Sequence, residues 1–269
     1  MDRPNWAPAD VDLDRPSVAR VYDYYLGGSH NFAADRAFGE QVLRVMPAVA
    51  GLARSNRAFL RRAVRKLARQ GVRQFLDLGS GIPTVGNVHE VIADAGITDA
   101  RVVYVDHDPV AVAHSRAILA DVPGTAVVAG DLRSPADVLA QPQVQGLLDF
   151  TRPVAFLLVA VLHFVPDEMG PADIVAGYAA AGVPGSYLVL SHAGLDRALT
   201  PAEEDAYRLY RTSPTPLILR SKEEVAKLFG DLTLLEPGVV STHHWRPDGD
   251  EEPPVEGNAI GSAAVARKD

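Results

Sequence analysis

The sequence predicts a doubly wound α/β domain that follows a helical amino-terminal segment. After Arg73, short apolar runs alternate with amphipathic stretches of helix length. The runs are rich in Val, Leu and Phe without polar alternation, which is typical of parallel strands that helices cover on both faces. The predicted strands are residues 74–78, 101–105, 125–129, 154–160 and 187–191. This alternation of strands and helices predicts a parallel sheet between two helical layers.

Before this pattern begins, residues 1–70 are predicted to form a helical cap. Helices are expected at 17–26 and 33–46, separated by a Gly27-Gly28 break. Residues 54–73 then carry eight basic side chains and no acid, while apolar residues recur at helical spacing. The spacing predicts a third helix with most of its arginines on the solvent face. The alternative is a contact surface for an anionic partner.

Helix starts within the α/β region are marked by capping residues. A capping side chain precedes a proline at Asp108-Pro109, Ser134-Pro135 and Thr200-Pro201. Two capping boxes are predicted, from Thr200 to Glu203 and from Ser221 to Glu224. A helix over 221–229 leads to two further predicted strands, 232–240 and 259–266, with only a loop between them. Strands joined without a helix are expected to be antiparallel neighbours.

Composition excludes several classes of protein. The chain has 269 residues, 47% of them hydrophobic, and a net charge of −8, with no cysteine. Disulfide scaffolds, thiolate zinc sites and cysteine nucleophiles are therefore excluded. The longest apolar run, 154–162, is too short to span a membrane, and no export signal is seen, so we expect a cytoplasmic protein. The acidic balance argues against a general nucleic-acid or membrane-surface binder.

The first predicted strand ends in the segment Asp77-Leu78-Gly79-Ser80-Gly81. Glycines after a strand let the backbone approach a ligand closely. A dinucleotide fingerprint needs a third glycine where Thr84 stands. A carboxylate at Asp77 would repel a diphosphate but attract the ammonium and sulfonium groups of S-adenosylmethionine, so the pattern favours this cofactor over NAD. The alternative is a tight turn that binds no ligand.

Two more carboxylates follow the next two strands. Asp106 ends the second strand, where a carboxylate accepts hydrogen bonds from ribose hydroxyls, and the neighbouring Asp108 is better explained as a helix N-cap. Gly130-Asp131 follows the third strand, where Asp131 is positioned to accept from an adenine amine. Its alternative role is turn formation. Three carboxylates at successive strand ends suit a positively charged nucleoside.

Several motifs together resemble those of class I S-adenosylmethionine-dependent methyltransferases: Asp77-Leu78-Gly79-Ser80-Gly81, Val105-Asp106, Gly130-Asp131-Leu132 and Ala160-Val161-Leu162-His163-Phe164. More narrowly, residues 22–36, 56–60 and 74–84 resemble the actinobacterial S-adenosyl methyltransferase family once catalogued as a domain of unknown function. The resemblance runs from about residue 16 to the end of the chain. It implies a Rossmann-like, seven-stranded sheet whose last two strands form an antiparallel pair.

The resemblance also implies a set of cofactor-binding positions. The glycines would pass beneath the methionine moiety, Asp77 would hold its amino group through water, and Asp106 would bind the ribose. Asp131 and Leu132 would flank the adenine, while Val159 and Ala160 would lie near the sulfonium. The complete candidate set is Tyr22, Asp77, Gly79, Ser80, Gly81, Thr84, Asp106, His107, Asp131, Leu132, Val159 and Ala160.

Methyl transfer needs little acid–base chemistry, because alignment of the reactants supplies most of the acceleration. His163, just beyond the fourth strand, is the best candidate for a general base, and His192 is the second. The alternative for His163 is a packed histidine bonded to backbone. Tyr22, Tyr24, Tyr25 and Phe32 are candidates for a wall over the cofactor or acceptor, or for simple helix packing. No metal site is expected.

These features predict a methyltransferase that uses S-adenosylmethionine and a small-molecule acceptor. Residues 1–70 form the cap, and residues 71–269 form the cofactor-binding domain. One alternative is a non-catalytic protein that senses S-adenosylmethionine or S-adenosylhomocysteine. Another, less favoured by the charge, is a nucleic-acid methyltransferase that uses the basic residues from Arg54 to Arg73. The sequence does not indicate an oligomeric state.

Overall fold

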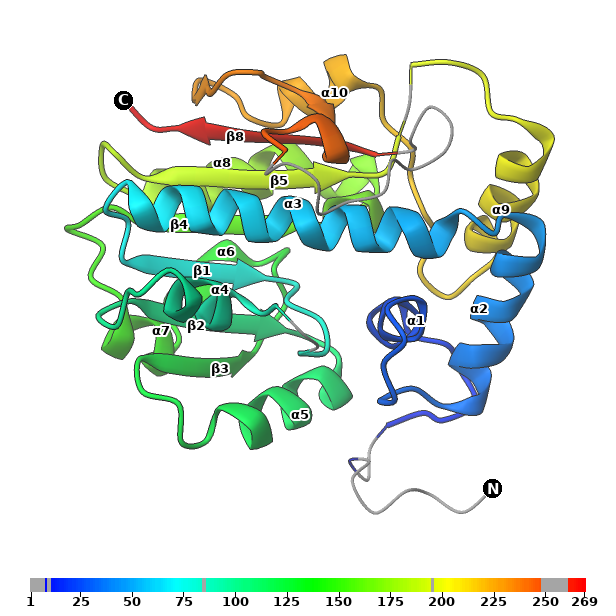
Figure 1. Cartoon of the computed structure of the whole chain (residues 1–269), viewed down its shortest axis with the longest axis horizontal. Helices are drawn as coiled ribbons and strands as arrows, with labels where there is room; N and C mark the ends of the chain where they lie inside the picture. The colour runs from blue at the N-terminus through cyan, green and yellow to red at the C-terminus, as the bar shows by residue number, and fades with distance from the viewer. Residues whose placement is uncertain (1–7, 9–10, 84–85, 195, 248–260) are drawn as a thin grey trace.

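The computed structural model describes residues 8, 11–83, 86–194, 196–247 and 261–269. Its centre is an eight-stranded sheet of order β3-β2-β1-β4-β5-β8-β6, with β7 also paired to β8 (Figure 1). The strands are β1 (Gln74–Leu78), β2 (Arg101–Asp106), β3 (Thr125–Ala129), β4 (Ala155–Val159), β5 (Tyr187–His192), β6 (Thr233–Leu234), β7 (Val240–Ser241) and β8 (Ser262–Arg267). The first five are parallel, and β8 is antiparallel to β5, β6 and β7. The predicted fold class is confirmed.

Ten α-helices surround this sheet within the described residues. They are α1 (Val18–Tyr25), α2 (Ala33–Val45), α3 (Val49–Arg69), α4 (Val88–Asp94), α5 (Pro109–Leu119), α6 (Pro135–Leu139), α7 (Pro142–Leu147), α8 (Pro171–Ala181), α9 (Pro201–Arg211) and α10 (Lys222–Lys227). Three short 3-10 turns complete the set: η1 (Leu162–Phe164), η2 (Asp167–Met169) and η3 (Thr242–His244). In the described part of the chain, no helix is long and apolar enough to cross a membrane.

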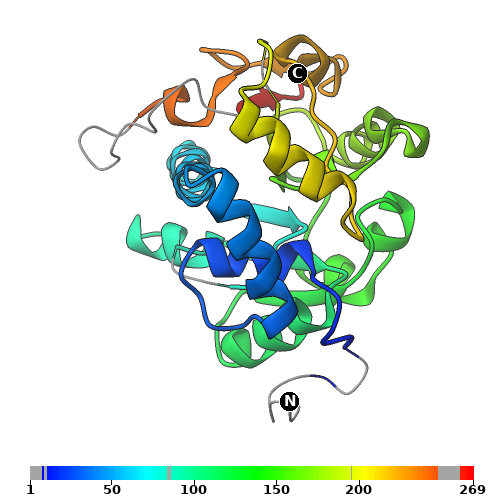
Figure 2. The same cartoon turned by 90° about the vertical axis from the view of Figure 1, so that its right-hand side faces the viewer.

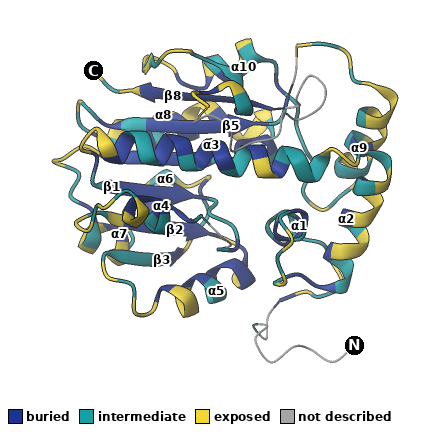
Figure 3. Cartoon of the chain, viewed as in Figure 1, coloured by how far each residue is buried: buried dark blue, intermediate teal, exposed yellow. Residues whose placement is uncertain are grey.

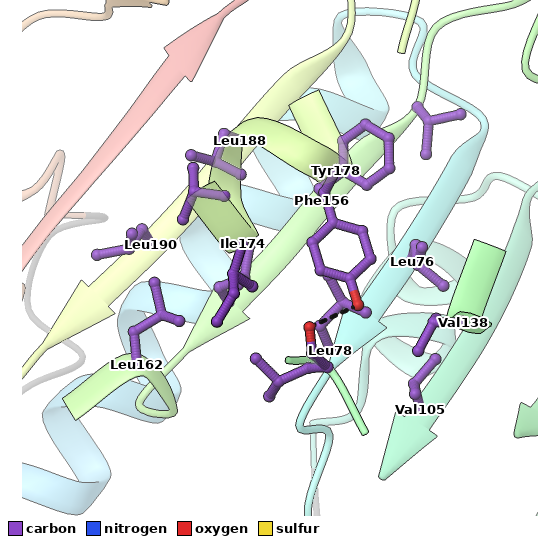
Figure 4. Close-up of a cluster of buried hydrophobic side chains, with 14 of the residues drawn as sticks. Leu76, Leu78, Val105, Val138, Phe156, Leu162, Ile174, Tyr178, Leu188 and Leu190 are labelled. Atoms are coloured by element: carbon purple, nitrogen blue, oxygen red, sulfur yellow. Dashed lines mark hydrogen bonds between the residues drawn. The ribbon is translucent and has the colours of Figure 1, made fainter. Parts of the chain in front are cut away.

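Alternate residues of the strands build two separate cores, one on each face of the sheet. On one face, Phe75 of β1 packs with Phe59 and Leu67 of α3. On the other face, Leu76 and Leu78 of β1 pack with residues of α6, α7, α8 and α10. Figure 4 shows this second core, where the dashed line marks the hydrogen bond from the Tyr178 hydroxyl to the carbonyl of Leu132 (2.9 Å). Because both faces are covered, every residue of β1 is buried, as the strand's dark colour in Figure 3 shows.

The cap consists of α1, α2, the start of α3 and α9. Figure 1 shows these helices grouped beyond the arrowheads of the parallel strands, and the view in Figure 2 looks onto them. The sequence analysis assigned only residues 1–70 to the cap, but α9 packs against α2 from a position far along the chain. The second half of α3 instead packs on the sheet. Long-range packing, which local patterns do not report, therefore adds α9 to the cap.

A buried polar cluster attaches the cap to the start of α5. The Ser17 hydroxyl donates to Asp108 Oδ2, and Arg20 donates from Nη1 to the same oxygen (3.5 Å) and from Nε to Asp35 (2.9 Å). The other Asp108 oxygen accepts from the backbone N–H of Val110 (2.8 Å), as an N-cap does. The Asp108 carboxylate is thus the N-cap of α5 and also bonds residues at the start of α1, in the helical cap. The predicted N-cap role of Asp108 is confirmed.

Two local predictions differ from the structure. The predicted strand 232–240 is divided into β6 and β7, so the sheet has eight strands where seven were expected. Between them, Pro237 has no N–H to donate, and Gly238, at φ 78°, donates to the carbonyl of Leu235 in a turn. The capping boxes at Thr200 and Ser221 are present, but Ser134 makes no side-chain cap.

The basic stretch faces solvent less fully than predicted, because one of its side chains is buried and five are half-buried. Of the eight basic residues from Arg54 to Arg73, only Arg54 and Arg69 are exposed. Arg62 is buried and donates to the carbonyls of Thr242 and Trp245. Arg62 and Arg73 are thus tied to the fold through their guanidinium groups, whereas Arg54 and Arg69 are exposed.

Candidate functional site

A cavity of about 230 Å³ lies between the carboxyl ends of the parallel strands and the cap. Strands β1 and β4 are neighbours there, while the chain continues from β1 to β2 on the other side, so the cavity sits at the topological switch point of the sheet. We distinguish two halves. The strand-end half is lined by residues at the ends of β1, β2 and β4 or directly after them: Asp77, Gly79, Ser80, Gly81, Ile82, Asp106, His107, Val159, Ala160 and Val161. The cap half is lined by cap residues and by the segments after η1, β5 and α9.

The turn after β1 is held by backbone bonds to the neighbouring strand. Gly79 and Ser80 both donate to the carbonyl of Val105 (2.8 and 3.1 Å), and Gly81 donates to Asp106 Oδ2 (2.7 Å). Gly79 has φ 73°, and a Cβ there would meet the side chain of Val161 at 2.5 Å. Only glycine fits this position, and its backbone forms the floor of the strand-end half.

Two carboxylates of this half are removed from water. Asp77 and Asp106 are each 6% exposed and line the cavity. Burial raises the pKa of Asp77 to about 7, against an opposing effect of Arg57 and with a further rise from Asp106. Burial also raises the pKa of Asp106, although N–H donors of Asp108 and Gly81 stabilise its charge. A cation bound in the cavity would replace the lost hydration of both groups.

The other predicted residues of this half lie at different distances from the cavity. His107 lines it with a side chain that is 67% exposed. Asp131 is outside the lining, and Nε and Nη2 of Arg133 donate to its carboxylate, which lowers the pKa of Asp131. Leu132 is buried beside Gly79. Thr84 lies outside the described residues. The adenine-flanking roles of Asp131 and Leu132 stay predictions.

A chain of hydrogen bonds connects the end of β4 to the cap. Ala160, at φ 57°, donates its N–H to the Ser191 hydroxyl (2.9 Å), which donates to Oδ1 of Asn56. The Asn56 amide donates to the Tyr22 hydroxyl (2.9 Å), which donates to the carbonyl of Ala53 (3.0 Å). The chain joins β4, β5, α3 and α1. Asn56 and Ser191 were not predicted as site residues, although Asn56 begins one of the motifs that carry the resemblance.

His163 and His192 face each other across the backbone of Ala193. The Ala193 N–H donates to Nδ1 of His163 (3.2 Å), and its carbonyl bonds Nδ1 of His192 (2.7 Å). Nε2 of His192 bonds Nη1 of Arg220 (2.7 Å), whose guanidinium also pairs with Asp167. Burial lowers the pKa of His163 well below its usual value and the pKa of His192 to about 4. Both rings are therefore neutral at pH 7, and Arg220 was missed by the sequence analysis.

The wall of the cap half is mostly apolar. Tyr25 and Tyr210 share a hydrogen bond between their hydroxyls (3.0 Å), which links α1 to α9. Aliphatic and aromatic side chains form the remainder: Met46, Val49, Leu52, Phe164, Leu199, Tyr207, Leu217 and Leu219. Tyr24 bonds Glu40 at the surface, and Phe32 packs near α5, so neither lines the cavity.

The residues present fit a positively charged nucleoside. Each oxygen of Asp106 accepts one backbone N–H and keeps a lone pair for a ribose hydroxyl. Buried carboxylates fit an ammonium or sulfonium group and do not fit a diphosphate. Among known families, the one described as S-adenosyl methyltransferase matches residues 4–269. The chain belongs to this family. It is an S-adenosylmethionine-dependent methyltransferase, and S-adenosylmethionine is its cofactor.

Solved structures agree with this membership. An inferred methyltransferase from Thermobifida fusca is 42% identical, with a TM-score of 0.91 over 99% of this chain and 100% of that chain. A protein of a domain-of-unknown-function family from Streptomyces avermitilis is 38% identical, with a TM-score of 0.89 over 96% and 99%. Human N-acetylserotonin methyltransferase, solved with S-adenosylmethionine, shares the fold at 16% identity and a TM-score of 0.51, over 95% of this chain and 63% of that chain. A comparison with curated proteins gave no match.

Proposed function

We propose that this methyltransferase acts on a small-molecule acceptor that binds in the cap half of the cavity. The observation that carries the proposal is that the cavity is continuous from the turn after β1 to the apolar wall between α1, α3 and α9. The wall and the cofactor-binding turn belong to one space of about 230 Å³. An enclosed, mostly apolar lining of this kind suits a small molecule that is uncharged or weakly charged.

In this proposal, each residue of the strand-end half keeps the role that the resemblance implies. The backbone of Gly79, Ser80 and Gly81 supports the methionine moiety, Asp77 holds its amino group, and Asp106 binds the ribose. Val159 and Ala160 line the site of the methyl group. Bound S-adenosylmethionine supplies a methyl group on a sulfonium, which makes that carbon electrophilic. The protein's own contribution is to align the acceptor with it and to exclude water.

The basic stretch does not favour a nucleic-acid acceptor. Arg62 bonds backbone carbonyls beneath the surface, and Arg73 pairs with Asp99. Arg57 lines the small-molecule cavity. Three of the eight basic side chains are therefore engaged within the fold or the cavity, which leaves fewer to contact a phosphate backbone, as an acceptor nucleic acid would require.

Two measurements test the proposal. Calorimetric titration with S-adenosylhomocysteine and NAD should show binding of the first and none of the second. Incubation with cofactor labelled in the methyl group and fractionated metabolites should then move label into a fraction of low molecular mass. Label that enters only RNA or protein would refute the small-molecule acceptor. Tight cofactor binding with no label leaving it in any extract would instead support a sensor.

A further inference from the structure

The two buried histidines of the cap half have fixed protonation patterns. Arginine has only donors, so Nη1 of Arg220 donates to Nε2 of His192, and the proton of this neutral ring is on Nδ1, where it bonds the Ala193 carbonyl. A backbone N–H also only donates, so Nδ1 of His163 accepts from Ala193 and carries no proton. The proton of His163 is therefore on Nε2.

Nε2 of His163 is the ring atom left for a ligand. Within the part of the chain that the structure describes, His163 lines the cavity, and its only side-chain hydrogen bond is the one at Nδ1. The ring is wedged edge-on against Phe164 and His192, with centroids 4.3 and 5.5 Å away. Packing and the Ala193 bond together fix the ring, so His163 presents an N–H donor to the cavity and no lone pair.

The charged and titratable groups around the ring do not change this pattern. Burial lowers the pKa of His163, His192 and Arg220 act in the same direction, and Asp167 pairs with Arg220. On α9, Glu203 is held by Arg197 and by the backbone of Thr200, and the Arg197 bond lowers the pKa of Glu203 to about 2. Burial raises the pKa values of three tyrosines of the cap half, Tyr22, Tyr25 and, to about 12, Tyr210. These described groups offer no general base near pH 7.

This inference rests on the proposed function and names the acceptor class. We propose that His163 is a fixed hydrogen-bond donor to the acceptor's nucleophilic oxygen. The acceptor is a flat molecule with an acidic hydroxyl of the phenol or enol type. Arg220 is the positioning residue that fixes the protonation pattern of the two histidines. The hydroxyl loses its proton to solvent before transfer. The oxygen lone pair then forms the oxygen–carbon bond, and the electron pair of the broken sulfur–carbon bond stays on sulfur.

Other nucleophiles fit this half less well. An N–H donor that bonds the lone pair of an amine would block the nucleophile itself. A carboxylate concentrates its charge on two oxygens, which is costly against the aliphatic part of the wall. A phenolate or enolate spreads its charge over a flat π-system, which packs well between the rings of Tyr25, Phe164 and Tyr210.

The first test is the protonation pattern itself, measured in the unaltered protein. Nitrogen-15 spectra of histidine-labelled protein should show one neutral ring protonated at Nδ1 and one at Nε2 that do not titrate between pH 5.5 and 8, assigned with His163→Gln and His192→Asn. A His163 signal that is protonated at Nδ1, or that titrates in this range, would overturn the proposal. Because this measurement needs no ligand, it is independent of whether the acceptor is a small molecule.

The second test uses chemical probes with S-adenosylhomocysteine already bound, so that cofactor binding is established separately. 4-Nitrophenol should bind in its coloured phenolate form and more tightly than benzoate or aniline. His163→Phe, which keeps a ring but has no donor, should weaken 4-nitrophenol about tenfold or more, the loss expected for one hydrogen bond to a charged group. His163→Gln should recover part of this loss. Preference for aniline or benzoate, or equal binding to His163→Phe, would overturn the acceptor class.

The role of Arg220 is tested by Arg220→Lys, with Arg208→Lys as a matched control. Arg208 also pairs with an aspartate, but it is exposed on α9. In Arg220→Lys the fixed Nδ1–H form of His192 should be lost and 4-nitrophenol should bind several-fold more weakly, while S-adenosylhomocysteine binds as before. The control Arg208→Lys should have the same histidine spectra and the same affinity for 4-nitrophenol as wild type. An unchanged histidine pattern in folded Arg220→Lys would remove Arg220 from the proposal.

Discussion

The strand-end half of the cavity is lined by two buried carboxylates, whereas several polar groups of the cap half are bonded to protein partners. Asp77 and Asp106 lie where a ligand's positive charge is expected. His192, Arg220 and Glu203 have their bonding atoms occupied by protein partners. The comparison teaches that the half with buried, uncompensated carboxylates suits a charged ligand, while the half proposed for the acceptor has polar groups that are already fixed by protein partners.

The largest effect is expected when a buried carboxylate of the strand-end half, that of Asp77, is replaced by a neutral side chain. In Asp77→Asn, the free energy of unfolding of the ligand-free protein should rise at pH 8 by at most about 4 kcal/mol. This limit is the shift of the Asp77 pKa from 3.8 to about 7, at about 1.4 kcal/mol for each pKa unit. The folded-state pKa is raised, so the stability that wild type has near pH 4 is lost as the pH rises to about 7. Urea unfolding of both proteins at pH 4, 5.5 and 8 measures the difference, and a pH-independent difference would contradict the interpretation.

Removing Asp106 should have the next largest effect. Asp106→Ala takes away the acceptor for the N–H groups of Gly81 and Asp108 as well as the proposed ribose partner. We expect S-adenosylhomocysteine to bind more weakly by about 1–3 kcal/mol, measured by calorimetry. The tautomers of the histidines in the cap half should not change. Wild-type affinity in a folded Asp106→Ala protein would place the ribose elsewhere.

A substitution confined to the cap half should leave the cofactor unaffected. Tyr210→Phe removes one partner of the bond between Tyr25 and Tyr210 and leaves the Tyr25 hydroxyl buried without it. The expected loss is about 1 kcal/mol of unfolding free energy, with unchanged affinity for S-adenosylhomocysteine. If cofactor affinity fell in parallel with stability, the two halves would not be independent.

The smallest expected effect is at Asp131, which follows β3 but does not line the cavity. Its half-exposed ion pair with Arg133 should contribute less than about 1 kcal/mol to stability, so Asp131→Ala should unfold nearly as wild type does. The affinity of Asp131→Ala for S-adenosylhomocysteine, compared with that of Asp106→Ala, then measures the adenine-flanking role of Asp131. A loss as large as that of Asp106→Ala would mean that Arg133 releases the carboxylate when the cofactor binds.

The strand-end half was predictable because each of its residues lies at the end of a strand or directly after it. A parallel sheet brings such positions to one edge whatever the intervening sequence, so Asp77, Gly79 and Asp106 could be placed from local patterns. The cap half was not predictable in the same way. Its wall comes from residues 17–60, 161–164 and 191–219, and their juxtaposition depends on how α9 packs on α2.

Periodicity also misjudged side chains with long apolar stems. The pattern of α3 placed its arginines on the solvent face, yet Arg62 bends its guanidinium to backbone carbonyls of η3 and its neighbour. The partner residues are about 180 positions away in the sequence, and no local signal marks them. Arg220 was missed for the same reason, since its partners follow β4 and β5.

The shared carboxylate of Asp108 has a consequence for how the protein opens. One of its oxygens holds the first turn of α5, and the other holds Ser17 and Arg20 of the cap. If α1 detaches, the Asp108 carboxylate loses its bonds to Ser17 and Arg20, and the start of α5 is then held less firmly. These segments are expected to behave as one cooperative unit in native-state hydrogen exchange, with the amide of Val110 and those of α1 sharing a common opening free energy.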